Sequence, residues 1–193
     1  MKRICIFCGS ASGVNPIYTA AACAIGTEIA ERGYELVYGG GRAGLMGIVA
    51  DAALNAGGNV IGVIPTALVE KETEHNSLTT LHVVNSMHER KALMADLSDA
   101  FIALPGGFGT LDEFCEIVTW AQLGYHRKPA CMLNTDGYFD KFLAFIDFSV
   151  EEGFIRAEHR TLILIDEQPA RLLDRLQVYE PPLMTKWLKR EQL

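Results

Sequence analysis

Hydrophobic residues in this chain form short continuous runs, and segments with helical spacing of apolar residues separate them. Runs that lack polar alternation are typical of strands buried on both faces of a parallel sheet. The pattern predicts seven strands, over residues 2–8, 34–38, 59–64, 81–85, 99–104, 130–133 and 161–165.

Helices are predicted between these strands, and several carry recognisable ends. Asn15 followed by Pro16 begins a helix that Gly33 ends, and Ser86 with Glu89 forms a capping box. The predicted helices span residues 15–32, 44–56, 86–98, 114–123 and 138–152.

The alternation of strands and helices indicates the fold class. It predicts an α/β fold with a doubly wound, mostly parallel sheet and helices on both faces, which is a Rossmann-like arrangement. A length of 193 residues suits one domain, which we expect over residues 1–180. Residues 181–193 then form a C-terminal tail, for which a short helix is one option.

Charge and cysteine content exclude several classes of protein. A net charge of −7 argues against nucleic acid or an anionic membrane surface as a partner. No apolar run approaches the ~20 residues of a membrane span, and the first residues lack the core of a signal peptide. Five cysteines, an odd number, lie mostly in apolar runs, so we expect reduced thiols in a cytoplasmic protein.

Cys5 and Cys8 form a C-x-x-C pair, but they lie within a predicted strand rather than at the start of a helix. Residues three apart on a strand face opposite sides, so we favour core packing over a redox or metal role. We therefore expect neither a metal site nor a cofactor.

The run from Pro105 to Glu113, PGGFGTLDE, is the most informative motif. A strand that ends in a glycine loop and then begins a helix is an anion site, because backbone N–H groups and the helix N-terminus attract phosphate. Glu113 follows this loop, where a carboxylate either balances the helix end or acts on a part of the substrate away from the phosphate.

Three other loops with special residues also follow predicted strands: Gly9-Ser10, Gly39 to Gly41, and Ser86 to Arg90. In a parallel sheet these loops and the Pro105 loop lie at one edge, where ligands bind. The convergence predicts a small-molecule pocket.

Residues 39–44, GGGRAG, match the dinucleotide pattern G-x-G-x-x-G. The match follows the second strand, and no acidic residue ends the third, so we favour a tight turn with close helix–sheet packing over NAD binding. The P-loop pattern for nucleoside triphosphates is absent.

Charged residues near this edge supply candidate chemistry. Arg90 and Lys91 lie beside the phosphate loop if the fourth and fifth strands are neighbours; otherwise they belong to a solvated helix face. Arginine suits forked hydrogen bonds to phosphate or ribose, and its charge would hold Glu113 ionised. Glu113 and Glu116 share a helix face, as paired carboxylates acting on a glycosidic bond do, although charge balance at the helix end is the simpler interpretation.

The motifs together resemble one family closely. SMHERK at residues 86–91, PGGFGTLDE at 105–113 and TWAQLG at 119–124 are similar to the LOG ("Lonely Guy") family of cytokinin riboside 5'-monophosphate phosphoribohydrolases. The resemblance extends to about Tyr179. It implies hydrolysis of the N-glycosidic bond of purine or cytokinin nucleoside 5'-monophosphates to free base and ribose 5-phosphate, without a cofactor, by a homodimer. Members are often labelled lysine decarboxylases, which nothing in this sequence supports.

The resemblance also implies roles for individual residues. Arg90 and Glu113 match the catalytic pair, and Asp112 stands where many members have glutamate. The residues expected to bind the substrate are Gly9, Ser10, Glu72, Met87, Lys91, Gly106, Gly107, Phe108, Gly109, Thr110, Glu116 and Thr119.

Two alternatives remain open at this point. One is a non-catalytic protein of similar fold that binds a nucleotide or the molybdenum cofactor, and the other is a dehydrogenase, which the weak dinucleotide match disfavours. The preferred base is also open among isopentenyl-type cytokinins, adenine and other purines.

Overall fold

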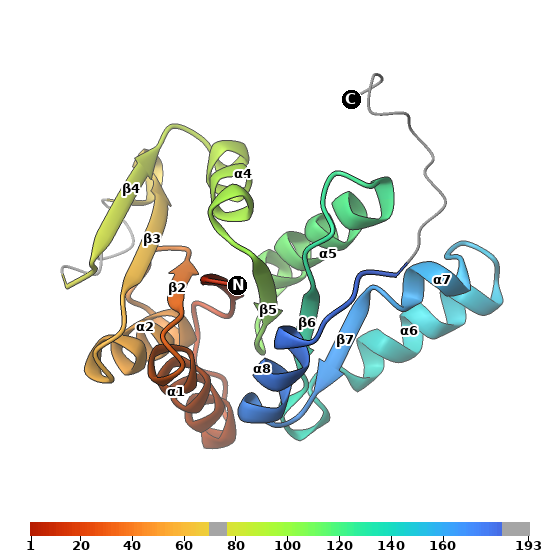
Figure 1. The fold of residues 1–193 in the computed structure, drawn as a ribbon, viewed down its shortest axis with the longest axis horizontal. Coiled ribbons are helices and arrows are strands. Elements are labelled where there is room, and N and C mark those ends of the chain that lie inside the picture. The colour runs from red at the N-terminus through yellow and green to blue at the C-terminus, as the bar shows by residue number, and fades with distance from the viewer. Residues whose placement is uncertain (70–76, 183–193) are drawn as a thin grey trace.

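The protein is built on one sheet of seven strands in the order β4-β3-β2-β1-β5-β6-β7 (Figure 1). A computed structural model describes residues 1–69 and 77–182. Every pair of neighbouring strands is parallel, which confirms the predicted fold class. The strands are β1 (Arg3–Phe7), β2 (Glu35–Tyr38), β3 (Val60–Pro65), β4 (Thr80–Val84), β5 (Ala100–Ala103), β6 (Ala130–Leu133) and β7 (Ile163–Asp166).

Helices cover both faces of the sheet. One face packs against α1 (Pro16–Glu31), α2 (Gly44–Asn55) and α8 (Pro169–Gln177). The other face packs against α4 (Met87–Leu97), α5 (Phe108–Leu123) and α6 (Asp140–Glu151). The short elements α3 (Thr66–Val69), η1 (Thr135–Gly137) and α7 (Ala157–Arg160) lie in the connections.

Successive residues of the central strand contribute to two separate cores. Ile4 and Ile6 pack in the cluster beneath α1 and α2, whereas Cys5 and Phe7 pack in the cluster beneath α4 and α5. All four side chains are buried. Burial on both faces explains why the strands appear as continuous apolar runs.

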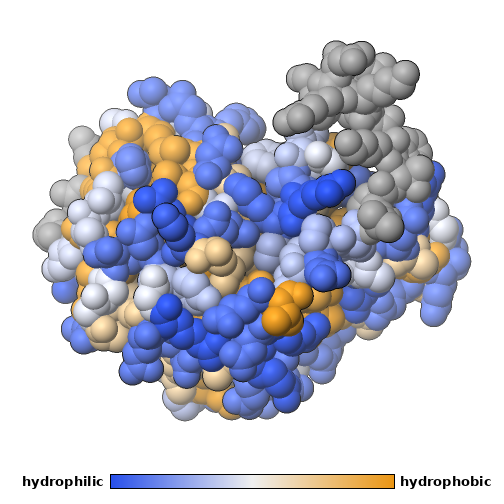
Figure 2. Space-filling view, viewed as in Figure 1, coloured by the Kyte–Doolittle hydropathy of each residue, from blue (hydrophilic) through white to orange (hydrophobic). Residues whose placement is uncertain are grey.

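The outer surface is mixed, with one apolar area over β3 and β4 on the face that Figure 2 shows. The exposed hydrophobic side chains of β4 include Val83, which is 55% exposed. Within the described ranges, no helix combines the length and the apolar character needed to span a bilayer.

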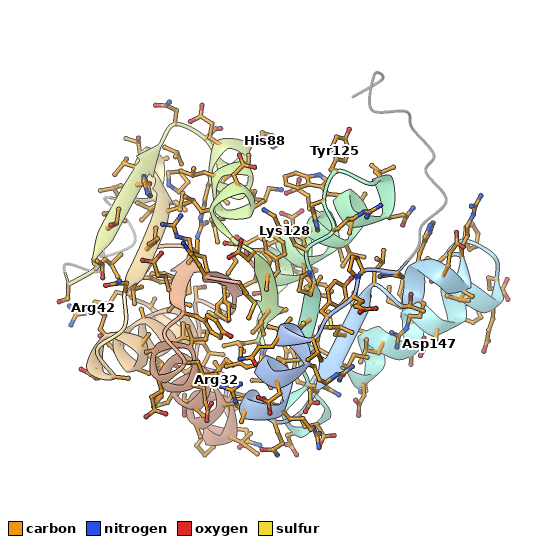
Figure 3. The ribbon with its side chains drawn as sticks, viewed as in Figure 1. Arg32, Arg42, His88, Tyr125, Lys128 and Asp147 are labelled. Atoms are coloured by element: carbon orange, nitrogen blue, oxygen red, sulfur yellow. The ribbon has the colours of Figure 1, made fainter. Side chains whose placement is uncertain are left out.

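Most predicted elements lie within a residue or two of the observed ones, but the short helices α3 and α7 were not predicted, and two longer helices also differ. α5 begins at Phe108, six residues before the predicted start, so its first turn includes the glycine loop. α8 was not predicted, although Pro169 at its first turn and Leu172, Leu173 and Leu176 on its buried face are typical of a helix. Arg32 at the end of α1 joins α8 through Asp174, at 2.6 Å between Nη1 and Oδ1 (Figure 3).

The fourth and fifth strands are not neighbours. The sequence placed Arg90 beside the phosphate loop only if these two strands were adjacent, so the helix must bring Arg90 there in another way. β4 lies at the edge of the sheet and β5 lies beside β1 at its centre. α4 spans this gap, because it begins after the edge strand and ends before the central one. Its N-terminal turn therefore lies over β3 and β2, from where Arg90 reaches Val63 and Gly39.

The cysteines are free thiols, as the sequence predicts. Cys5 is buried in one core, and Cys8 packs against the other, so the C-x-x-C pair faces opposite sides of the sheet. The predicted tail over residues 181–193 lies almost entirely outside the described residues, which end at Pro182.

The cap of α4 gives the first testable prediction. Ser86 Oγ accepts a hydrogen bond from the Glu89 N–H at 3.1 Å, while Glu89 Oε2 accepts from the Asn85 N–H at 2.8 Å, one residue before the expected partner. Ser86→Ala should lower the free energy of unfolding by about 1 kcal/mol in urea denaturation. Glu89→Gln keeps an acceptor oxygen and should cost less; an equal or larger loss would contradict this account of the cap.

Candidate functional site

A pocket of about 260 Å³ opens at the carboxyl edge of the sheet, between the loops that follow β1 and β5. Three of the four loops predicted to converge contribute to the wall of the pocket. The fourth, at Gly39, is absent from the wall, but its carbonyl oxygen accepts a hydrogen bond from Arg90. The lining residues are Cys8, Gly9, Ser10, Met46, Arg90, Gly107, Phe108, Gly109, Thr110 and Glu113.

The glycine loop presents the N-terminus of α5 to this pocket. Gly107 is the N-cap residue, and no side chain accepts a hydrogen bond from the first turn. Unpaired N–H groups at a helix start form an anion site. The loop is held by the Gly9 N–H, which donates to the Pro105 carbonyl oxygen at 3.0 Å.

Two glycines of this loop are not required by packing within the described protein. A Cβ atom at Gly107 or Gly109 would meet nothing within 4 Å, whereas one at Gly106 would lie 2.1 Å from Thr110 Oγ1. The missing side chains at Gly107 and Gly109 therefore leave space on the pocket side of the loop. Phe108, between them, is 95% exposed at the rim.

Glu113 lies on the second turn of α5 and lines the pocket. Its side chain is half-buried, and among the described residues nothing donates a hydrogen bond to the carboxylate. Burial raises the pKa of Glu113 to about 7, and the opposing charge of Arg90 only partly offsets this effect. We expected from the sequence that Arg90 would hold Glu113 ionised. The charge of Arg90 does lower the pKa of Glu113, but desolvation outweighs this effect in the free protein.

Arg90 is 7% exposed and is held by backbone carbonyl groups. Its Nε donates to the Val63 oxygen at 3.1 Å, and Nη2 donates to the Gly39 oxygen at 3.0 Å. Nη1 has a weak acceptor, the Met87 sulfur at 3.8 Å. Within residues 1–69 and 77–182, no carboxylate lies within 4.0 Å of the guanidinium, so Arg90 and Glu113 share a pocket without forming an ion pair.

Lys91 lies outside the pocket, in a cluster that joins α4 to α5. Its Nζ is 3.1 Å from Glu116 Oε1 and 3.2 Å from Asp112 Oδ2. Asp112 is therefore directed at Lys91, whereas Glu113 lines the pocket. Glu116 contacts Lys91 and is absent from the pocket wall, so the two carboxylates on this helix face do not converge on one ligand.

Two further predicted contacts also lie away from the pocket wall. Met87 is exposed at the start of α4, and Thr119 Oγ1 donates to the Cys115 oxygen at 2.7 Å beside a groove between α4 and α5. His88 is exposed at the outer end of α4 (Figure 3). Glu72, predicted to bind the substrate, lies outside the described residues.

Sequence reasoning missed several residues of this region. Cys8, assigned to core packing, and Met46, which was given no role, both line the pocket. Tyr138 donates from its hydroxyl to the Gly106 oxygen at 2.7 Å and packs edge-on against Tyr18. Its place after β6 carries no motif, so only the three-dimensional contact identifies it as a support of the glycine loop.

The described part of the chain contains no group of three or more histidine, cysteine, aspartate or glutamate side chains arranged to hold a metal ion.

Comparison with known proteins identifies the family. The family model described as "Possible lysine decarboxylase" matches residues 46–176. The cytokinin riboside 5'-monophosphate phosphoribohydrolase LOG7 of Arabidopsis thaliana is 51% identical over 180 residues, covering 93% of this chain and 83% of its own length. The cytokinin riboside 5'-monophosphate phosphoribohydrolase LOG of Oryza sativa subsp. japonica is 50% identical over 180 residues, covering 93% of this chain and 74% of its own length.

Solved structures that resemble this one share the fold at lower identity. The molybdenum cofactor carrier protein of Chlamydomonas reinhardtii aligns with a TM-score of 0.69 and 21% identity, covering 92% of this chain and 99% of its own. The molybdenum cofactor binding protein of Rippkaea orientalis gives 0.69 and 23%, covering 92% and 96%. The identity of about one half to the plant enzymes, over nearly the whole chain, is decisive: the chain belongs to the LOG family of cytokinin riboside 5'-monophosphate phosphoribohydrolases.

Proposed function

We propose that this protein hydrolyses the N-glycosidic bond of purine or cytokinin nucleoside 5'-monophosphates, releasing free base and ribose 5-phosphate. The observation that carries the proposal is the arrangement of one pocket, in which Arg90 and Glu113 face a helix N-terminus without contacting each other. Relatives named for this activity support it at 49–51% identity.

The 5'-phosphate binds at the start of α5. Backbone N–H groups from Gly107 to Thr110 point at this position, and the helix dipole favours a dianion there. Gly9 and Ser10 form the opposite wall of the pocket. The phosphate then anchors the nucleotide so that its ribose lies between Arg90 and Glu113.

Glu113 stabilises the ribose as the bond to the base breaks. The bonding electrons leave with the base nitrogen, and positive charge develops at C1' and the ring oxygen. The Glu113 carboxylate faces this charge or traps C1' covalently. Water supplies the hydroxyl group of ribose 5-phosphate and the proton of the free base, so the reaction needs no further reactant.

Arg90 orients the substrate and assists ionisation of Glu113. Its Nε and Nη2 are engaged by Val63 and Gly39, which leaves Nη1, with its weak sulfur acceptor, to donate to a ribose hydroxyl or the phosphate. The family resemblance also implies substrate contacts for Met87, Lys91, Glu116, Thr119 and Glu72. Lys91 and Glu116 bind each other outside the pocket wall, so the proposed reaction gives neither of them a direct contact with the ligand.

Lysine decarboxylation, the activity in the family model's description, fits Lys91 poorly. A decarboxylase of the pyridoxal phosphate type needs a lysine that loses its proton readily. Partial burial of Lys91 acts in that direction, but its hydrogen bonds to Glu116 and Asp112 prevail and raise its pKa. The ammonium group is also occupied by two carboxylates.

We also propose that the protein is a cytoplasmic homodimer, as the family resemblance implies. Its cysteines are free, which suits a reducing compartment. Exposed apolar side chains such as Val83 and Tyr125 provide surface for a second copy to cover. Thr119 lies beside a groove between α4 and α5 rather than in the pocket, and this groove offers further surface for a second copy.

Product analysis tests the proposed function. The purified protein should release base from AMP or isopentenyladenosine monophosphate without added metal or nicotinamide cofactor. Nucleosides without the phosphate should give a kcat/KM at least ~100-fold lower, because they lose about two charge-assisted hydrogen bonds at the helix start. Chromatography of both substrates side by side measures this ratio. Equal rates for adenosine and AMP, or no base release across purine monophosphates, would refute the proposal.

Glu113→Gln should fold and bind nucleotide but lose a factor of ~10² or more in kcat. Glutamine preserves size and helix propensity while removing the charge that faces the developing cation. Single-turnover kinetics with AMP measures the loss.

Asp112→Asn is the matched control, because Asp112 is adjacent in sequence, exposed, and paired with Lys91 rather than directed at the pocket. Its kcat should stay within about threefold of the wild type, equivalent to ~0.65 kcal/mol. The reverse ranking of the two variants would reassign the catalytic carboxylate.

The raised pKa of Glu113 predicts a pH dependence of stability. Because the folded-state pKa of about 7 exceeds the ordinary value of 4.5, folding favours the protonated carboxyl, and this contribution is lost as the pH rises from about 4.5 through 7. Ligand-free Glu113→Gln should therefore exceed the wild type in unfolding free energy above pH 7, by up to about 3 kcal/mol. Urea titrations at pH 5 and 8 measure the difference, which should shrink at the lower pH; a constant difference would contradict the assignment.

A further inference from the structure

The glycine run that follows β2 has no role in the proposed reaction, yet its first residue, Gly39, contacts the Arg90 guanidinium. Gly39 is buried, and its carbonyl oxygen accepts the hydrogen bond from Arg90 Nη2 at 3.0 Å. The second backbone acceptor, Val63, belongs to the neighbouring strand β3. The guanidinium is therefore held by the residue that follows β2 and by a residue within the adjacent strand β3.

Gly39 is also the residue whose missing side chain makes this position available to Arg90. A Cβ atom on Gly39 would lie 1.9 Å from Arg90 Nη2 and 3.0 Å from Arg90 Cζ. No side chain fits at residue 39 while the guanidinium keeps its position. The three nearest atoms to that Cβ position all belong to Arg90, so the conflict is with the guanidinium itself.

The position of the guanidinium matters because its three nitrogens have different tasks. Two of them are engaged by backbone carbonyls, and this fixes the plane of the group. Nη1, with the Met87 sulfur at 3.8 Å as its acceptor, is the nitrogen left to meet a ligand. Because the guanidinium is planar, fixing Nε and Nη2 also fixes the direction of Nη1. The ammonium group of a lysine would not be fixed in this way.

We propose that Gly39 is a positioning residue for catalysis: the first glycine of the GGGRAG motif exists to seat the Arg90 guanidinium, and not to bind a dinucleotide. The inference rests on the proposed function for its catalytic part and on the described contacts for its structural part. It assigns a physical role to a motif that sequence analysis interpreted as a tight turn.

Gly39→Ala tests the proposal by two readouts. The added methyl group must displace the guanidinium, and misplacement of a catalytic group by about 1 Å costs on the order of 10²-fold. We expect kcat/KM for AMP to fall ~10–100-fold. Crowding of a buried group should also lower Tm by about 5 °C.

Gly26→Ala is the matched control, since its Cβ atom would lie 2.4 Å from the Val49 oxygen where α1 packs on α2, and none of the three atoms nearest to it belongs to Arg90. It should lower Tm while the folded protein keeps its kcat. An equal loss of kcat in both variants would mean that general destabilisation explains the effect, and it would overturn the proposal.

A double-mutant cycle with Arg90→Ala tests the contact between residue 39 and the guanidinium separately from catalysis. If the conflict is with the guanidinium, Gly39→Ala should shift Tm by less than ~1 °C in the Arg90→Ala background, where the opposing atoms are gone. A loss equal to that in the wild type, or a double variant that fails to fold, would overturn the proposal. This cycle measures Tm and needs no turnover. Absence of nucleotide hydrolysis would therefore refute the proposed function, while the Tm values would still decide whether Gly39 positions Arg90.

Discussion

A buried guanidinium held by two backbone carbonyls is the interaction around which the site is organised. Removing a cation from water is costly unless its donors are satisfied, and Val63 and Gly39 provide acceptors without adding a negative charge. A carboxylate partner would have neutralised Arg90 at this point. Because the acceptors are neutral, the positive charge of Arg90 stays directed at the pocket, where it lowers the pKa of Glu113 and, in the proposed function, attracts the phosphorylated ribose.

Burial raises the pKa of Glu113, and the absence of a close ion pair between Arg90 and Glu113 explains why this rise is only partly offset. Without a hydrogen bond from the described residues, its carboxylate depends on the field of Arg90 to offset desolvation, and the offset is incomplete. The free protein therefore holds Glu113 near the midpoint of its titration at neutral pH. In the proposed reaction, a cationic ribose in the transition state supplies the missing stabilisation, so the charge on Glu113 is stabilised most when the glycosidic bond breaks.

Much of the fold and part of the site could be predicted from the sequence. Continuous apolar runs locate the strands because both faces are buried, and PGGFGT locates the candidate phosphate loop because its glycines follow a strand and begin a helix. The order of the strands was not predicted, because nothing in the apolar runs shows that β3, β2 and β1 lie between β4 and β5. Tyr138 and Cys8 reach the site through contacts that leave no local pattern in the chain.

The glycine motifs illustrate why a pattern alone does not identify its cause. Gly107 and Gly109 leave open space above a helix start, which suits an approaching ligand. Gly39, in a run that matches a nucleotide fingerprint, instead lacks a side chain because a protein group occupies that space. Both cases satisfy the same rule that glycine permits close approach. The two motifs differ in the group that approaches the glycine: a ligand at Gly107 and Gly109 in the proposed function, and the Arg90 side chain at Gly39. Arg90 reaches Gly39 because α4 crosses the sheet from its edge, and neither glycine motif contains a signal for that crossing.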